Sequence, residues 1–218
     1  MILLLVRHGL TSVTGQKLTG RLPGFGLSDQ GQRQAQAAAN RLASVPLQAI
    51  YSSPMQRCTQ TAEAIAAMHG KPVVTVDKLS EIDYGRWQGK SFKTLYKNPG
   101  WKKLRARPAD FRFPGGETIR EAQTRGVLGV EELRTRHPEE SAGAVVACSH
   151  SDMIRLLVAA YLGLGIDLYD RINVAPGSIT AVSVGEGTPA LLSLNDTGDY
   201  DGLQNMLKAT PEKSKEGR

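Results

Sequence analysis

The sequence has little cysteine and little histidine. Two cysteines in 218 residues, Cys58 and Cys148, are too few for a disulfide framework. Four histidines are present, and none is close to another in the way that metal ligands are usually spaced. We therefore expect no structural disulfide, no metal site and no other cofactor.

Long apolar runs are also missing, and the net charge is modest. No apolar run reaches the length of a membrane span, and residues 2–6 have neither a basic segment before them nor a small-residue cleavage site after them. The formal charge of +6 suits an anionic ligand but is low for a nucleic-acid-binding protein. We expect a cytoplasmic protein of one domain, with neither a membrane nor a nucleic acid as its partner.

The first residues of the chain have the pattern of a buried strand. The apolar residues 2–6 are too few for a helix, and they lead directly to Arg7, His8 and Gly9. A cation beside an imidazole lowers the pKa of that imidazole and can hold an anion. Taken alone, this tripeptide is better explained as a strand end that faces solvent.

The following segments alternate between strand and helix patterns. A glycine-rich loop over residues 11–31 precedes a helix that Ser28 or Asp29 can cap and that ends near Pro46. A strand is expected over residues 47–51, then a helix from Met55 to about residue 68 with Pro54 in its first turn, then a short strand over residues 73–76. This alternation predicts an α/β fold, a three-layer α/β/α sandwich with a mostly parallel central sheet.

The second half continues the pattern after one interruption. A long amphipathic helix is expected over residues 117–136, a fourth buried strand over 144–148 and a helix over 153–162. Residues 179–184 and 190–194 flank a glycine-rich turn, which predicts a C-terminal β-hairpin. We expect the domain to span residues 1–207 and the polar residues 208–218 to form a disordered tail.

The interruption is a strongly basic segment. Between Lys90 and Arg112, eight basic residues face a single acid, Asp110, and we interpret residues 90–114 as a basic flap inserted into the sandwich. A solvated basic surface explains these charges at least as well as an electrostatic funnel for an anionic substrate.

Five charged residues follow the predicted strands at similar positions. Arg7 and His8 follow the first strand, Arg57 begins the helix after the second, Glu81 follows the third and His150 follows the fourth. Each has an ordinary explanation by itself, as a surface charge or a helix cap. Because ligands of an open α/β sheet bind outside the carboxyl ends of its strands, we expect the five to converge on one site.

Several short motifs carry a family resemblance over about residues 1–195. They are Arg7-His8-Gly9, Leu18-Thr19-Gly20-Arg21, Ser52-Ser53-Pro54-Met55-Gln56-Arg57 with Gln60-Thr61-Ala62, Glu81-Ile82-Asp83-Tyr84-Gly85, Pro114-Gly115-Gly116-Glu117 and Ser149-His150. In this order they resemble the histidine phosphatase superfamily, the phosphoglycerate-mutase-like clan.

The resemblance implies roles for the five converging residues. His8 is then the nucleophile that forms a phosphohistidine, Arg7, Arg57 and His150 hold the phosphoryl oxygens, and Glu81 is the general acid and base. Phosphoryl transfer requires mainly positioning and positive charge around three equatorial oxygens, which these residues can supply without a metal.

The resemblance carries over less securely to the substrate contacts. Thr14, Thr19, Gly20 and Ser151 align with substrate-binding positions or lie beside them. Many relatives have an acidic residue at the position of Leu10 and Asn at that of Thr14, and most have Gly where Ser151 stands, so the substrate contacts of this chain need not match theirs.

The resemblance leaves more than one function open. We expect a phosphatase of small phosphorylated metabolites, similar to α-ribazole and broad-specificity phosphatases, because cofactor-dependent mutases carry Arg where this chain has Ile82. A cofactor-dependent phosphoglycerate mutase is the first alternative, and a non-catalytic anion-binding protein that uses the basic flap is the second. The sequence names no substrate, and a homodimer stays open.

Overall fold

The fold is built on one six-stranded mixed sheet. The computed structural model describes residues 1–138 and 143–198. Its strands are β1 (Ile2–Arg7), β2 (Leu47–Ser52), β3 (Val73–Thr75), β4 (Ala144–Ser149), β5 (Ile179–Ser183) and β6 (Ala190–Asp196). The order across the sheet is β3-β2-β4-β1-β5-β6; β1 to β4 run parallel, and β5 and β6 form the antiparallel C-terminal hairpin. The predicted α/β fold with a mostly parallel sheet is confirmed.

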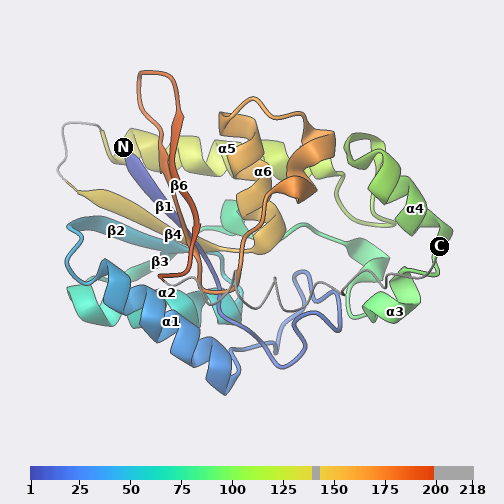
Figure 1. The fold of residues 1–218 in the computed structure, drawn as a ribbon, viewed down its shortest axis with the longest axis horizontal. Helices are drawn as coiled ribbons and strands as arrows, with labels where there is room; N and C mark the ends of the chain where they lie inside the picture. The colour runs from blue at the N-terminus through green and yellow to red at the C-terminus, as the bar shows by residue number, and fades with distance from the viewer. Residues whose placement is uncertain (139–142, 199–218) are drawn as a thin grey trace, which may run out of the picture.

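Helices cover both faces of this sheet (Figure 1). On one face lie α1 (Asp29–Leu42) and α2 (Gln56–His69), and on the other lie α5 (Ile119–Arg136) and α6 (Ser151–Tyr161). Successive side chains of β1 point to opposite faces, so Leu3 and Leu5 pack in the α5/α6 core while Leu4 and Val6 pack in the α1/α2 core. The central strand β4 is buried over its whole length, as expected for a parallel strand that is covered on both sides.

The helices begin where capping side chains allow them to. Ser28 Oγ accepts a hydrogen bond from Gly31 N at 3.1 Å, and Thr118 forms a capping box with Glu121 at the start of α5. The helix expected from residue 117 therefore begins at Ile119. The helix expected from Met55 begins at Gln56, and Pro54 precedes its cap rather than lying in the first turn.

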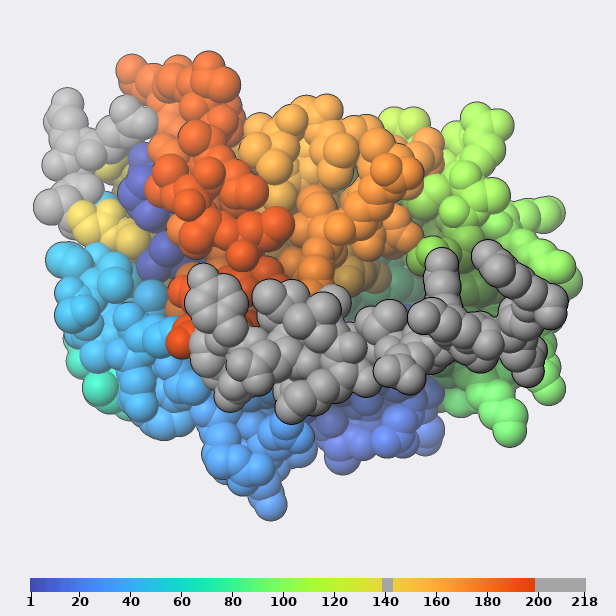
Figure 2. Space-filling view, viewed as in Figure 1, coloured from blue at the N-terminus to red at the C-terminus, as the bar shows by residue number. Residues whose placement is uncertain are grey.

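The basic flap, residues 90–114, is more ordered than the sequence indicated. It contains the short helices α3 (Phe92–Leu95) and α4 (Pro99–Ala106) and a 3-10 turn, Pro108–Asp110. Asp167 Oδ1 accepts a hydrogen bond from Ala109 N at 2.7 Å, and Arg105 forms an ion pair with Asp170 at 2.7 Å. Figure 2 shows the flap in green at one end of the molecule, against the orange segment that follows α6.

The remaining described segments are loops and 3-10 turns, among them Asp77–Leu79, Gly85–Trp87 and Ile166–Arg171. Within the two described ranges, no helix is both long enough and apolar enough to cross a membrane. The predicted tail, residues 208–218, lies outside the described residues.

Candidate active site

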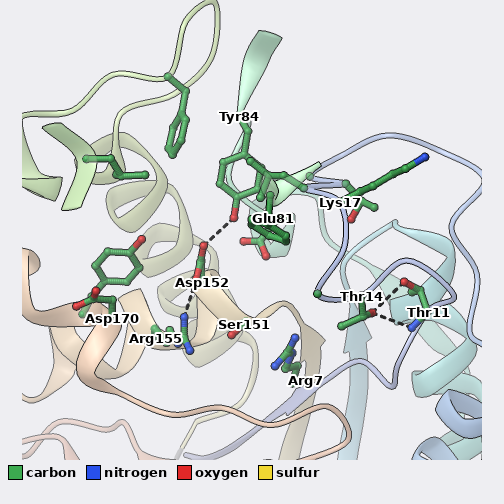
Figure 3. A pocket seen from close by; sticks show the side chains of 18 of the residues that line it. Arg7, Thr11, Thr14, Lys17, Glu81, Tyr84, Ser151, Asp152, Arg155 and Asp170 are labelled. Atoms are coloured by element: carbon green, nitrogen blue, oxygen red, sulfur yellow. Dashed lines mark hydrogen bonds and ion pairs between the residues drawn. The ribbon is translucent and has the colours of Figure 1, made fainter. Parts of the chain in front are cut away.

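The parallel strands deliver four of the five predicted catalytic residues to one cavity. It has a volume of about 400 Å³, and Arg7, His8, Arg57 and Glu81 line it. The predicted substrate residues also line it, at Thr14, Thr19, Gly20 and Ser151. His150 belongs to the same cluster, but it lies beneath Arg57 and does not reach the cavity wall. Figure 3 shows Arg7, Glu81, Thr14 and Ser151 around this space.

His8 is held with one ring nitrogen free to act as a nucleophile. Its Nδ1 lies 2.7 Å from the carbonyl oxygen of Gly9, which can only accept, so Nδ1 carries the proton. Nε2 of the neutral ring is then unprotonated, and it accepts a hydrogen bond from Arg57 Nε at 3.1 Å. Burial, and then the charges of Arg57 and Arg7, hold the pKa of His8 well below its usual value. The imidazole is therefore neutral at pH 7.

Gly9 itself is required by close packing. A Cβ at Gly9 would lie 2.3 Å from the carbonyl oxygen of Gly31 at the start of α1. The chain can leave β1 at this angle only without a side chain here. The position of the His8 ring thus depends on the approach of α1.

Arg57 connects His8 to His150. Its Nη2 donates to the Gly20 carbonyl oxygen at 2.7 Å and to His150 Nδ1 at 3.0 Å, and the two imidazole rings lie 5.2 Å apart. Since Nδ1 of His150 accepts, the proton of its neutral ring is on Nε2, which donates to Ser53 Oγ at 2.7 Å. Burial and then the charge of Arg57 hold the pKa of His150 well below its usual value. Both imidazoles are therefore neutral in the absence of an anion.

Arg7 supplies a second guanidinium. Its Nη1 donates to the Val174 carbonyl oxygen at 2.5 Å, while its buried Nε has no hydrogen-bond partner among the described residues. Two largely buried arginines and neutral imidazoles make this end of the cavity positive, which suits a phosphoryl group.

Glu81 brings the one carboxyl group of the predicted set. Its side chain is 8% exposed, and Oε1 accepts a hydrogen bond from Ile82 N at 3.0 Å. Burial, and then the nearby Asp152 carboxylate, raise the pKa of Glu81 to about 7, against the opposing effects of Arg57 and Arg7. A carboxyl group with this pKa can both donate and accept a proton near neutral pH.

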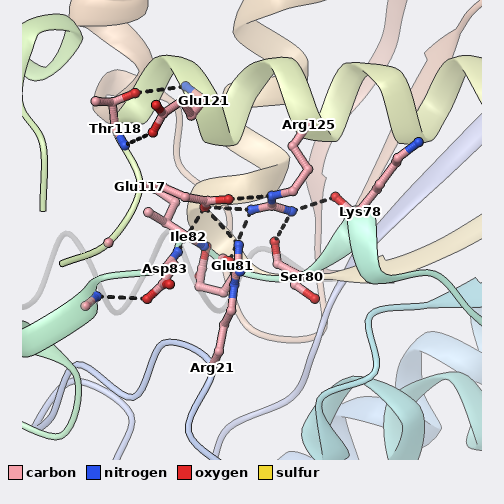
Figure 4. Close-up of polar contacts among 12 residues, drawn as sticks. Arg21, Lys78, Ser80, Glu81, Ile82, Asp83, Glu117, Thr118, Glu121 and Arg125 are labelled. Atoms are coloured by element: carbon pink, nitrogen blue, oxygen red, sulfur yellow. Dashed lines mark hydrogen bonds and ion pairs between the residues drawn. The ribbon is translucent and has the colours of Figure 1, made fainter.

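A cluster of charged side chains fixes the main chain of Glu81 through hydrogen bonds to its carbonyl oxygen (Figure 4). The Glu81 carbonyl oxygen accepts from Arg21 Nε at 2.8 Å and from Arg125 Nη2 at 3.2 Å. Both arginines also bind Glu117, and Arg125 Nη1 donates to the carbonyl oxygens of Lys78 and Ser80. The arginines thus attach the segment before Glu81 to α5 and to the loop that carries Gly20.

The predicted substrate residues belong to two elements. Thr14, Thr19 and Gly20 belong to the loop after β1, where Thr14 Oγ1 accepts a hydrogen bond from Thr11 N at 2.9 Å. Gly20 has φ of +53°, and a Cβ there would meet the side chains of Gln88 and Tyr84. Ser151 is the first residue of α6. Both elements therefore contribute to the lining of the cavity.

The structure also brings in residues that sequence reasoning did not assign to the site. Asp152 lines the cavity and accepts from Tyr84 Oη at 2.7 Å and from Arg155 Nη1 at 3.1 Å. Tyr169 and several flap side chains complete the wall. Asp152 lies two residues after His150, and this spacing could have indicated that it belongs to the site. No feature of the sequence indicated that Tyr169 does.

No candidate metal site is present within the described ranges, since no three His, Cys, Asp or Glu side chains there are grouped to hold an ion. Both cysteines are free and buried. Burial raises the pKa of the Cys58 thiol to about 12, which makes it a poor nucleophile.

Comparison with known proteins places this site in context. The sequence model of the histidine phosphatase superfamily (branch 1) matches residues 3–197. Phosphoserine phosphatase 1 of Hydrogenobacter thermophilus is 30% identical over 200 residues, covering 89% of this chain and 92% of that protein. A 2,3-bisphosphoglycerate-dependent phosphoglycerate mutase of Thermoplasma acidophilum is 28% identical over 211 residues, covering 94% and 98%. The solved structure of a mycobacterial glucosyl-3-phosphoglycerate phosphatase with VO3 superposes with a TM-score of 0.81 at 29% identity, covering 89% and 98%.

Proposed function

Because the chain belongs to branch 1 of the histidine phosphatase superfamily, we propose that it hydrolyses phosphomonoesters of small metabolites through a phosphohistidine on His8, without a metal. The observation that carries this proposal is the state of His8, a neutral imidazole whose unprotonated Nε2 accepts a hydrogen bond from Arg57 and whose pKa the charges of Arg57 and Arg7 lower. A nucleophile of this kind beside a carboxyl group of pKa about 7 is what a two-step phosphoryl transfer requires.

In the first step, His8 Nε2 forms a bond to phosphorus while the bond to the ester oxygen breaks. The phosphoryl oxygens replace Nε2 as the partner of Arg57, and the Arg7 guanidinium, which lines the cavity, adds a second positive charge beside them. Glu81 gives its proton to the departing alcohol. The arriving dianion raises the pKa of His150, and the ring takes up a proton from solvent. Its Nδ1 then turns from accepting a hydrogen bond of Arg57 to donating to a phosphoryl oxygen, and the proton returns to solvent when phosphate leaves.

In the second step, water attacks the phosphohistidine and the bond between Nε2 and phosphorus breaks. Glu81, now ionised, accepts the proton of the attacking water. Phosphate leaves, and both His8 and Glu81 return to their initial protonation states. The cycle needs no other reactant.

A mutase is the second candidate, since a relative bears that name. It would return the phosphoryl group to a sugar acid rather than to water. The residue after the acid favours hydrolysis, because mutases of the clan carry Arg there and this chain has Ile82, which is fully buried in the apolar core. Released phosphate distinguishes the two reactions.

The central experiment follows the phosphoryl group. Wild-type protein, quenched rapidly during turnover of a labelled phosphomonoester, should carry an acid-labile label on histidine. His8→Ala should release no phosphate and take up no label, while the matched variant His69→Ala, altered at the far end of α2, should behave as the wild type does. A label on Ser, Cys or Asp would overturn the assignment of His8.

Metal independence has a separate experiment. Phosphate release should persist in excess chelator, because the two arginines, and His150 once it is protonated beside the bound dianion, supply the positive charge that a metal would otherwise provide. Loss of activity on chelation, restored by a divalent ion, would contradict this part of the proposal.

A further inference from the structure

Aromatic side chains are concentrated on one wall of the cavity. The chain has 12 aromatic residues (2 Trp, 6 Tyr and 4 Phe) in 218. Five of them line this one cavity, together with Leu104 and Pro108. We call these five the aromatic wall: Tyr84, Phe92, Trp101, Phe113 and Tyr169. A share this large in one small space points to a ligand that the rings contact.

The aromatic wall is held rigidly by further rings. Trp101 stacks on the buried Trp87 with ring centroids 6.0 Å apart, and Phe92 meets Trp101 edge to face at 6.2 Å. Phe113 meets both Tyr84, at 4.9 Å, and Trp87, at 5.4 Å. The wall is therefore formed before any ligand arrives, so little entropy is lost when a ring packs against it.

The carboxylates and arginines near this wall are paired with one another. The Asp152 carboxylate accepts from Arg155 and Tyr84, and that of Asp170 is bound by Arg105 at 2.7 Å. Of the eight basic residues of the flap, only Arg105 lines the cavity. Lys17 also lines the cavity, but it is exposed, and Figure 3 shows its side chain directed away from Glu81. The interpretation of the flap as an electrostatic funnel therefore gains little support, because the flap presents mainly rings and Leu104 to the cavity.

The proposed acid lies between the positive end and this wall. Tyr84 follows Glu81 by three residues, and the two groups are close enough to interact electrostatically. Figure 3 shows the Glu81 carboxyl group beside the Tyr84 hydroxyl. An alcohol that receives its proton from Glu81 would therefore have its carbon skeleton against the rings.

We propose that the preferred substrates are phosphomonoesters of uncharged alcohols that carry an aromatic or similarly flat apolar group. This inference rests on the proposed function and specifies its substrate class. The carboxylate or ammonium of phosphoserine or a phosphoglycerate would lose its hydration against the rings, where the neighbouring carboxylates and arginines already have partners, which is costly. Burial of a phenyl ring against the wall favours its ester on the order of 10- to 100-fold in kcat/KM.

The experiment compares alkyl phosphates, so that differences in leaving-group reactivity do not decide the result. Phosphate release is measured with 2-phenylethyl phosphate, ethyl phosphate, O-phosphoserine and 3-phosphoglycerate. We expect kcat/KM for 2-phenylethyl phosphate to exceed each of the others at least 10-fold. Equal or faster release from phosphoserine or phosphoglycerate would overturn the inference and leave the proposed function intact. No release from any of these or from p-nitrophenyl phosphate would overturn both.

Variants of the wall test its contribution directly. Trp101→Ala and Leu104→Ala should each lower the ratio of kcat/KM for 2-phenylethyl phosphate to that for ethyl phosphate by about 5-fold or more. This ratio does not depend on the fraction of folded protein, so partial misfolding cannot imitate the effect. Leu128→Ala, at an exposed apolar position on α5, should leave the ratio unchanged. An unchanged ratio in both wall variants would overturn the inference.

Discussion

Glu81 and Asp152 are two carboxyl groups that line one cavity, and their proximity sets the pH range of the proposed acid. After burial, the charge of Asp152 is the largest influence that raises the pKa of Glu81 to about 7. Asp152→Asn removes that charge and keeps the shape, since the Tyr84 hydroxyl can turn to accept from the new amide. The pH at which hydrolysis of alkyl phosphates declines should fall by on the order of half a unit to one unit.

The measurement is the pH dependence of kcat for ethyl phosphate. Asp170→Asn is the matched control, because Asp170 lines the same cavity but is bound to Arg105 on the flap. Asp170 is not among the main influences on the pKa of Glu81, so the decline in kcat of Asp170→Asn should occur at the same pH as in the wild type. An equal movement in both variants would show that the total charge of the cavity, rather than Asp152, sets the pH range.

Removal of the acid itself should depend on the leaving group. An alkoxide must be protonated as it departs, whereas p-nitrophenolate is stable enough to leave unaided. Glu81→Gln should therefore slow phosphoryl transfer from alkyl phosphates on the order of 100-fold or more, and transfer from p-nitrophenyl phosphate much less. Burst-phase kinetics measure this step, because breakdown of the phosphohistidine also needs the carboxylate.

Asp83→Asn provides the comparison. Asp83 Oδ1 accepts hydrogen bonds from Gly85 N and Gln88 Nε2, and the residue does not line the cavity. Any change in the burst-phase rate of Asp83→Asn should be the same for alkyl phosphates and for p-nitrophenyl phosphate. If Asp83→Asn shows the dependence and Glu81→Gln does not, the acid has been assigned to the wrong carboxyl group.

Among the elements, α5 contributes to the site through a single guanidinium. Arg125 donates to the carbonyl oxygens of Lys78, Ser80 and Glu81 and to both carboxylate oxygens of Glu117. Arg125→Lys keeps the charge but cannot satisfy these acceptors together. We expect kcat for alkyl phosphates to fall about 10-fold with little change in KM, because a small displacement of Glu81 harms proton transfer more than binding.

The matched control is Arg120→Lys, an exposed position on the same helix, which should leave kcat unchanged. Transfer from p-nitrophenyl phosphate in the burst phase should be nearly insensitive to Arg125→Lys, because that step hardly needs the acid. If both substrates slow equally, Arg125 acts through general stability and not through the position of Glu81.

The regular elements could largely be predicted from sequence because local signals agreed with the fold. The apolar run before Arg7, the Ser28 cap and the strand before His150 each specify an element without distant contacts. The helices of the flap were not predicted, since α3 is too short to show periodicity and Asn98, which caps α4, is common in loops. Val76, expected at the end of the third strand, instead leads into a 3-10 turn in which the Lys78 carbonyl oxygen accepts a hydrogen bond from Arg125.

The site could be predicted in part for a related reason. Arg7 and His8, which the end of β1 places directly, follow from topology and motif order, whereas Glu81 is separated from β3 by the 3-10 turn Asp77–Leu79 and follows from motif order alone. Tyr169 and Trp101 come from a 3-10 turn after α6 and from the flap, and tertiary packing alone brings them to the cavity. The location of His150 beneath Arg57 likewise depends on side-chain contacts that no spacing in the sequence indicates.

At the scale of the whole molecule, the buried charge of the site lowers stability as pH rises. Glu81 has a folded pKa of about 7, above its ordinary value of 4.5. Its contribution to stability is thus fully present below pH 4.5 and is lost as the pH rises through 7. This rise of the pKa from 4.5 to about 7 lowers the free energy of unfolding at high pH by at most on the order of 3 kcal/mol.

Glu81→Gln should therefore stabilise the protein progressively as the pH rises. Its melting temperature should be close to that of the wild type at pH 5 and about 5–10 °C higher at pH 8.5, since the variant never buries a carboxylate. Thermal melts at the two pH values measure the difference. Stability gained by loss of the proposed acid would mean that the protein keeps a destabilising group at the position where the reaction needs it.

Glu117→Gln tests whether this pH dependence is specific to Glu81. Burial alone would raise the pKa of Glu117, but hydrogen bonds from Arg125 and Asp83 N and the charges of both arginines outweigh it and lower the pKa. Its stabilising contribution is thus lost only as the pH falls below 4.5. Glu117→Gln should destabilise the protein by a similar amount at pH 5 and pH 8.5, whereas the gain in Glu81→Gln should grow with pH. If the two variants instead respond to pH in parallel, the pKa of Glu81 is not raised, and its carboxyl group is too acidic to protonate an alkoxide at neutral pH.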